Sequence, residues 1–257
     1  MSSSHTPSHP LVIAVAGGTG VVGRHTVDAV RAQGHECRVL TRGRGVDLVS
    51  GRGLDAALDG VDAVIDTSNV TTLSAGRSTD FFRAATGNLI AAAEHAGVGH
   101  LVLLSIVGVD RMPYDYYAGK VAQEAVVEAS AGPWTILRAT QFHEFAGQLF
   151  SRARLGPLHL APRAPVQPIA AREVGEHLAT LAAGAPGGRA DDLAGPREER
   201  LDDMVRRYAR RTRHRGWVPS VSLPGKQMKG MRAGYALPDE HAVLGTQTFA
   251  DWLDELD

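Results

Sequence analysis

The chain is poor in several features that would each point to a class of protein. Its 257 residues contain a single cysteine, Cys37, which excludes an internal disulfide. The 27 basic and 28 acidic residues give a formal net charge of −1, so the overall charge does not favour nucleic acid as a partner. Aromatic residues make up only 5% of the chain, and no stretch reaches the roughly 20 apolar residues that a membrane-spanning helix needs.

The remaining composition indicates one large α/β domain. Hydrophobic residues make up 44% of the chain, enough for a sizeable core. Residues 1–10 are mostly Ser, His, Thr and Pro, which predicts a disordered tail and neither a signal peptide nor a membrane anchor. The 11 histidines lack the spacing of a zinc site, so no metal is expected. We expect a cytoplasmic protein and leave its oligomeric state open.

A glycine-rich turn between a strand and a helix is the strongest motif. An apolar run from Leu11 to Val15 predicts a buried strand, a helical pattern then extends to Gly34, and Glu36–Leu40 predicts a second strand. This order is typical of a dinucleotide site, where the pyrophosphate binds the free amides of the helix N-terminus. Thr19 is expected to contact a phosphate or to cap the helix. The residues predicted to bind the cofactor are Gly17, Gly18, Thr19, Gly20, Val22 and Gly23, together with Thr67 at a later strand end.

The residues after the second strand indicate which dinucleotide binds. NAD sites usually place an acid there for the ribose hydroxyls, whereas this chain has Thr41-Arg42-Gly43-Arg44. Arg42 is the candidate for the 2′-phosphate, with Arg44 assisting, so NADP(H) is preferred over NAD(H). The alternative is that both arginines lie on a solvated loop.

Strands and helices continue to alternate along the chain, which predicts a doubly wound parallel sheet. The expected strands after the second are 46–50, 61–66, 100–105 and 134–142. The expected helices are 53–58, 78–96 and 116–129, with further helices beginning near residues 172 and 201.

Three polar residues around the strand at 100–105 are the candidate catalytic residues. Tyr116 and Lys120 are four residues apart, so on a helix they share one face, where the ammonium would lower the pKa of the phenol and also hold the nicotinamide ribose. Ser105 at the strand end would bond a substrate carbonyl, and Tyr116 would donate the proton. The alternative is that the tyrosines only pack on the helix and Lys120 only holds the ribose.

These motifs together resemble a known superfamily. Gly17-Gly-Thr-Gly-x-x-Gly23, Ser105-Ile-Val-Gly, Tyr116-x-x-x-Lys120 and the run Trp134–Phe142 are similar to the short-chain dehydrogenases/reductases, specifically their atypical, NmrA-like NAD(P)H-binding branch. The resemblance implies a Rossmann-type fold with a small C-terminal substrate-binding lobe. Within one domain of residues 11–257, we expect 142–170 and 195–257 to form that lobe.

The resemblance also implies substrate contacts and shows two departures. Phe142 and His143 follow the strand that faces the nicotinamide in relatives, so they are expected to line the substrate cleft. Relatives usually carry an Asp after the third strand that binds adenine, whereas the chain reads Val49-Ser50-Gly51-Arg52-Gly53. Ser105 and Tyr116 are also closer in sequence than in most reductases.

The sequence therefore predicts an NADPH-dependent reductase of a carbonyl or quinone-like small molecule. Two alternatives stay open: a redox sensor that binds NADP(H) without catalysis, and a nucleotide-sugar epimerase, against which Arg42 argues. The arginine-rich run between Arg206 and Arg215 is interpreted as a solvated helix surface, with nucleic-acid binding as the minor alternative.

Overall fold

The computed structural model describes residues 9–156 and 158–256 and divides the chain into two compact units. The first unit comprises residues up to 105, 114–138 and 172–190, and the second comprises 106–113, 139–171 and 191 onward. Both ranges predicted for the substrate lobe fall in the second unit, and its role in substrate binding stays a prediction. Most of the predicted N-terminal tail lies outside the described residues.

The first unit is built on a twisted sheet with the strand order β5-β4-β3-β1-β2. In parallel ladders, β1 pairs with β2 on one side and β3 on the other, and β3 pairs with β4. The strands are β1 (Val12–Ala16), β2 (Glu36–Leu40), β3 (Ala63–Asp66), β4 (His100–Ile106) and β5 (Trp134–Ala139), with a short β10 (Gly188–Arg189) beside β5.

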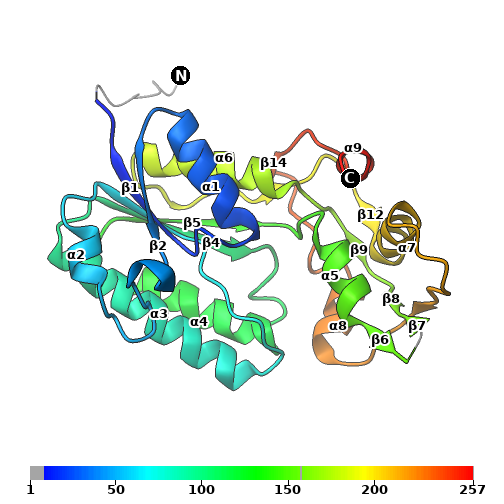
Figure 1. Ribbon diagram of the computed structural model, residues 1–257. Coiled ribbons are helices and arrows are strands. Elements are labelled where there is room, and N and C mark those ends of the chain that lie inside the picture. Colours follow the sequence, from blue (N-terminus) through cyan, green and yellow to red (C-terminus); the bar gives the residue numbers. More distant parts are fainter. Residues whose placement is uncertain (1–8, 157, 257) are drawn as a thin grey trace. The chain divides into compact units, whose positions relative to one another are not determined.

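Helices cover both faces of this sheet (Figure 1). They are α1 (Val21–Ala32), α2 (Leu54–Leu58), α3 (Ala75–His95), α4 (Tyr116–Glu128) and α6 (Ala171–Ala183). Helices α1 and α6 lie on one face, and α3 and α4 lie on the other. This two-sided cover explains why β1 and β3 are almost continuously apolar, since their side chains are buried on both faces.

The predicted strand at 46–50 is wrong. After a 3₁₀ turn at Arg42–Arg44, the Asp47 Oδ1 accepts hydrogen bonds from the amides of Val49 at 2.9 Å and Ser50 at 3.2 Å. The Asn88 side chain in α3 donates to the carbonyls of Leu48 and Val49, at 3.0 and 2.8 Å. The backbone of this segment is thus satisfied by side chains, and it forms a turn instead of a strand.

The second unit combines short helices with two-residue strands. Its helices are α5 (Phe145–Arg152), α7 (Leu201–Arg211), α8 (Lys226–Arg232) and α9 (Phe249–Asp254). Its strands are β6 (Arg154–Leu155), β7 (Leu158–His159), β8 (Ala161–Pro162), β9 (Pro165–Val166), β11 (Leu193–Ala194), β12 (Glu199–Arg200), β13 (Ser220–Val221) and β14 (Val243–Leu244). They form the pairs β6–β7, β8–β13, β9–β12 and β11–β14. Among the described helices, none is long and apolar enough to cross a membrane.

The close crossing of α3 and α4 depends on a glycine and gives a testable prediction. A Cβ at Gly119 would lie 2.6 Å from the backbone carbon of Ser78, whereas a Cβ at Gly87, also within a helix, would meet nothing within 4 Å. We expect Gly119→Ala to lower the free energy of unfolding by about 1–3 kcal/mol through overpacking. Gly87→Ala is expected to raise it by about 0.5–1 kcal/mol. Urea unfolding followed by circular dichroism checks both, and equal effects would contradict the tight crossing.

Candidate functional site

The turn after β1 forms a cradle that only glycine can build. Gly17 has φ +74°, and a Cβ there would lie 2.7 Å from the carbonyl oxygen of Thr67. A Cβ at Gly23 would lie 2.1 Å from the Gly17 oxygen, while the Gly20 amide donates to that same oxygen at 2.9 Å. The turn is therefore pressed against the end of β3, while Thr19 and Gly20 remain exposed.

The N-terminus of α1 is open for an anion. Gly20 is its N-cap residue, no side chain caps the helix, and no acid stands in the first turn. Thr19 is exposed and does not cap the helix, whereas Val22 is buried and anchors the first turn. Uncapped amides and the positive end of the helix dipole favour a phosphate at this place. The observed cradle thus fits the pyrophosphate of a dinucleotide.

The residues after β2 carry positive charge. Arg42 and Arg44 are both exposed, and among the described residues neither guanidinium has a hydrogen-bond or ion-pair partner. Free guanidiniums are the groups that bind a 2′-phosphate, and the predicted contact of Arg42 with one stays a prediction. Thr67, by contrast, has its hydroxyl bonded to the Ala16 carbonyl at 2.7 Å, so it holds β3 against β1.

The missing strand also changes the interpretation of the adenine site. The expectation of an adenine-binding acid after residue 50 depends on a strand at 46–50, which the structure does not contain. Asp47 is half-buried in the turn that follows β2, and one of its carboxylate oxygens is held by the amides of Val49 and Ser50. The sequence analysis missed Asp47 because it was counted inside a strand.

A buried polar network lies between β3, α3 and α4. Asp66 accepts hydrogen bonds from Thr86 at 3.1 Å and from the Gln123 amide at 3.0 Å. Lys120 donates to the carbonyl of Leu104 at 2.7 Å and to the side chain of Gln123. Burial lowers the pKa of Lys120 to about 8, although the nearby carboxylates of Asp66 and Glu124 oppose this shift. Lys120 therefore points into the unit and is committed to protein partners.

Tyr116 opens α4 but is not paired with Lys120. Its hydroxyl donates to Oδ1 of Asn69 at 2.7 Å, and its ring lies edge-on to Phe82 with the centroids 5.8 Å apart. Burial raises the pKa of Tyr116 well above its ordinary value, and the neighbouring Tyr117 and Asp66 raise it further. The two residues share one helix as the spacing predicts, yet the expected lowering of the phenol pKa by Lys120 is not what the structure shows. Asn69 is a partner that the sequence analysis did not single out, and its only signal is its place after the carboxyl end of β3.

Ser105 faces a buried carboxylate. It is only 2% exposed near the end of β4, and its hydroxyl has no hydrogen-bond partner among the described residues, although its proximity contributes to lowering the pKa of Glu124. Burial alone would raise the pKa of Glu124. Arg138 donates to both Glu124 oxygens, at 2.9 and 2.7 Å, and keeps that pKa below its ordinary value. Ser105 thus lies beside a buried ion pair without bonding to it, and its catalytic role stays a prediction.

The two predicted substrate residues lie in the second unit. His143 is 0% exposed, its Nε2 is 3.1 Å from the carbonyl of Gln247, and its ring packs against Phe249 and Trp252. Phe142 is half-buried and forms a parallel bridge with Ile169. Both therefore contribute to the packing of the second unit, and their contact with a substrate stays a prediction. Among residues 9–156 and 158–256, no cluster of three or more metal-binding side chains occurs.

Comparisons with known proteins place the chain in a family. The model of a family described as NAD(P)H-binding matches residues 17–157, which is more than half of the chain. The chain belongs to this NAD(P)H-binding family. This membership confirms the NAD(P)H-binding family that the predicted resemblance implies. A comparison with curated proteins gives no significant match.

Solved structures confirm the fold class. Similar ones include a short-chain dehydrogenase/reductase superfamily protein from Agrobacterium tumefaciens with bound NAD, at 19% identity, TM-score 0.67 and 95% coverage of each chain. A UDP-N-acetylglucosamine 4-epimerase from Bacillus cereus has 17% identity and TM-score 0.66, with 96% of this chain and 98% of that chain covered. The NADPH-dependent quinone oxidoreductase of Escherichia coli, complexed with NADPH, has 19% identity and TM-score 0.64, covering 94% and 98%. The fold is Rossmann-type, as predicted.

The buried ammonium of Lys120 predicts a characteristic pH dependence of stability. Because its pKa falls from 10.5 to about 8 on folding, the unfolded chain holds a proton between these pH values that the folded protein has released. The free energy of unfolding should therefore rise with pH from about 8 to 10.5, by up to about 3 kcal/mol from this group. We expect Lys120→Met to lose this rise, measured by urea unfolding at pH 7.5 and 9.5.

A control separates this effect from general alkaline behaviour. Lys229 is exposed on α8, so Lys229→Met should keep the pH dependence of the wild type. If the wild type and Lys120→Met respond equally to pH, the ammonium is not buried as described.

Proposed function

We propose that the protein is an NADPH-dependent oxidoreductase that reduces a carbonyl or quinone-like small molecule, with Tyr116 as the proton donor. The family membership supports binding of NAD(P)H, and the similarity to a quinone oxidoreductase from Escherichia coli supports a reductase. The observation that carries the proposal is the hydroxyl of Tyr116, which is held by one neutral side chain, that of Asn69.

The chain's own residues suit NADPH. The cradle of Gly17, Gly20 and Gly23 and the uncapped start of α1 would hold the pyrophosphate, and Arg42 with Arg44 would hold the 2′-phosphate. The half-buried carboxylate of Asp47 is a candidate acceptor for the adenine amino group. When bound, the nicotinamide supplies the hydride for the reduction.

Tyr116 suits the role of general acid. The phenol is protonated at neutral pH and so has a proton to give, although its raised pKa makes it a weaker acid than a free tyrosine. Asn69 accepts the hydrogen bond of that hydroxyl and fixes its direction, and the amide group of Asn69 offers donors to a substrate oxygen. In this arrangement Lys120 fixes the end of β4 against α4, and holding the ribose would require its side chain to leave the Leu104 carbonyl.

A second candidate function is a redox sensor that binds NADP(H) without turnover. The burial of Lys120 and Ser105 favours it, because both side chains are bonded or packed inside the first unit instead of facing a substrate. An epimerase is less well supported because the residues directly after β2, Thr41-Arg42-Gly43-Arg44, contain no acid to bind the ribose hydroxyls that NAD carries.

Cofactor choice is tested by calorimetric titration with NADPH and NADH. Removing a charge-assisted hydrogen bond of about 1.5–3 kcal/mol should make Arg42→Gln bind NADPH roughly 10–100-fold more weakly, with little change for NADH. Arg31→Gln is the matched control, since Arg31 is exposed in the last turn of α1, at the opposite end of the helix from the glycine turn. Equal losses for both cofactors would refute a 2′-phosphate contact.

Proton donation is tested with Tyr116→Phe, assayed by NADPH consumption with 1,4-benzoquinone and a panel of ketones. Loss of a positioned acid is expected to lower turnover about 10²–10⁴-fold while the affinity for NADPH stays the same. Turnover that survives in Tyr116→Phe would remove this residue from the chemistry. Tight NADPH binding without turnover in the wild type would support the sensor instead.

A further inference from the structure

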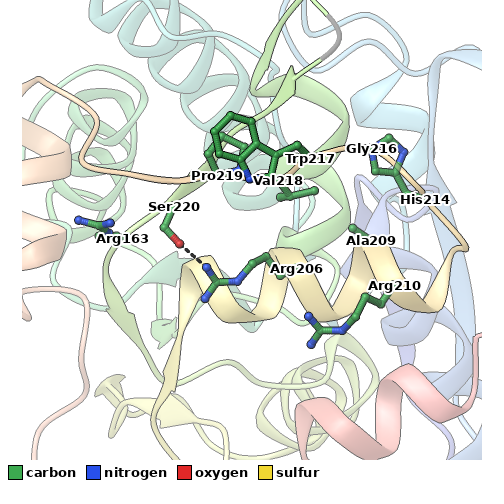
Figure 2. A pocket seen from close by; sticks show the side chains of 10 residues that line it. All are labelled: Arg163, Arg206, Ala209, Arg210, His214, Gly216, Trp217, Val218, Pro219 and Ser220. Atoms are coloured by element: carbon green, nitrogen blue, oxygen red, sulfur yellow. Dashed lines mark hydrogen bonds between the residues drawn. The ribbon is translucent and has the colours of Figure 1, made fainter.

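The second unit contains a pocket of about 550 Å³ beside the last turns of α7 (Figure 2). One wall is the face of α7 that carries Arg206 and Arg210, and the other is the segment 214–220 that returns after the helix. Arg163, which follows β8, borders one end. No acidic side chain lines this arginine pocket, so its charge is positive.

Two of the three arginines bind no other group in the described part of the chain. Arg163 and Arg210 are exposed, and within the described part of the chain their guanidiniums have neither an ion-pair nor a hydrogen-bond partner. Arg206 is different, because it lies 3.4 Å from Asp202 and donates to the hydroxyl of Ser220 across the pocket (Figure 2). Arg206 therefore shapes the pocket, and Arg163 and Arg210 leave positive charge unbalanced beside it.

The other arginines of the run serve the fold or lie away from the pocket lining. Arg207 pairs with Glu199 at 3.3 Å and lies over the ring of Phe249, and Arg211 donates to the carbonyl of Leu253 at 2.9 Å. The interpretation of the whole run as a solvated surface is thus too simple. Only two of its members, Arg206 and Arg210, line the pocket.

An exposed indole completes the pocket. Trp217 is 71% exposed although it is the bulkiest side chain of the lining. Its segment is anchored, because Arg213 with φ +58° ends α7 in a left-handed turn and the His214 amide returns to the Ala209 carbonyl at 2.9 Å. The His214 ring then packs on Phe150, with the centroids 5.0 Å apart. The indole is therefore presented on a fixed turn that forms part of the pocket lining.

We propose that this arginine pocket binds a small aromatic anion, a planar ring that carries a phosphate or a carboxylate. Arginine is well suited to the planar, bidentate recognition of both groups, and an indole face suits an aromatic ring. The volume lies within the range of about 300–1,000 Å³ for small-molecule sites and exceeds what a bare phosphate needs. A small ligand is favoured over nucleic acid because Arg207 and Arg211 are committed internally. This site is independent of the proposed reductase function.

The test is calorimetric titration of the full chain in the presence of saturating NADPH, which keeps the cofactor site filled. The probes are phenyl phosphate, benzoate and inorganic phosphate. We expect phenyl phosphate to bind more tightly than inorganic phosphate, and Arg210→Gln and Arg163→Gln each to weaken it about tenfold or more. Trp217→Ala should remove the preference for phenyl phosphate over inorganic phosphate. The affinities of benzoate and phenyl phosphate, compared with each other, show which anionic group the pocket prefers.

Arg215→Gln is the matched control, since Arg215 is exposed in the same segment but outside the lining. Thermal unfolding of each variant verifies that it folds, which is expected for exposed residues. The proposal is overturned if neither aromatic anion binds or if Arg215→Gln weakens binding as much as Arg210→Gln. It is also overturned if an oligonucleotide binds while phenyl phosphate does not. Failure of NADPH to bind would count against the proposed function and leaves this measurement intact.

Discussion

The contact between the glycine turn and the end of β3 is the constraint on which the first unit depends. Gly17 can lie against the Thr67 backbone, and Gly23 against Gly17, only because neither has a Cβ. This approach places the start of α1 directly over the strand end, at the point where the chain moves from β2 on one side of β1 to β3 on the other. In doubly wound sheets, ligands bind at this switch point. The geometry of the cofactor site is therefore a direct consequence of packing.

The second organising feature is the buried network of Asp66, Thr86, Gln123 and Lys120. It joins β3, β4, α3 and α4 with hydrogen bonds in a place where unpaired polar groups would be costly. The same network holds, by hydrogen bonds, the ammonium of Lys120, which the sequence pattern assigns to catalysis. A four-residue spacing shows that two side chains share a helix face, but it does not show whether a long side chain turns inward or outward. Lys120 turns inward to the Leu104 carbonyl, whereas the Tyr116 hydroxyl bonds to Asn69.

The sequence alone predicts the strands and helices whose apolar residues follow a regular local pattern. The apolar runs of β1, β3 and β4 and the helical periods of α1, α3 and α4 appear in the structure close to their predicted bounds. The segment 46–50 failed because its apolar residues resemble a strand, while the interactions that decide its shape come from Asp47 and from Asn88, about 40 residues away. The partner of Tyr116 and the arginine pocket were hidden for the same reason. Each depends on residues that only the folded chain brings together, such as Asn69 with Tyr116 or Arg163 with Arg210.

The turn at 46–50 also has a consequence for the sheet itself. Without a strand there, β2 ends the strand order of the first unit. An outermost strand offers unpaired backbone groups to any other extended chain, which is a common route to aggregation. Glu36 and Arg38 of β2 form an ion pair at 3.5 Å, and Arg38 also donates to the carbonyl of Ala57 in α2. Charge and a side-chain bridge thus protect an edge that another strand would otherwise have covered.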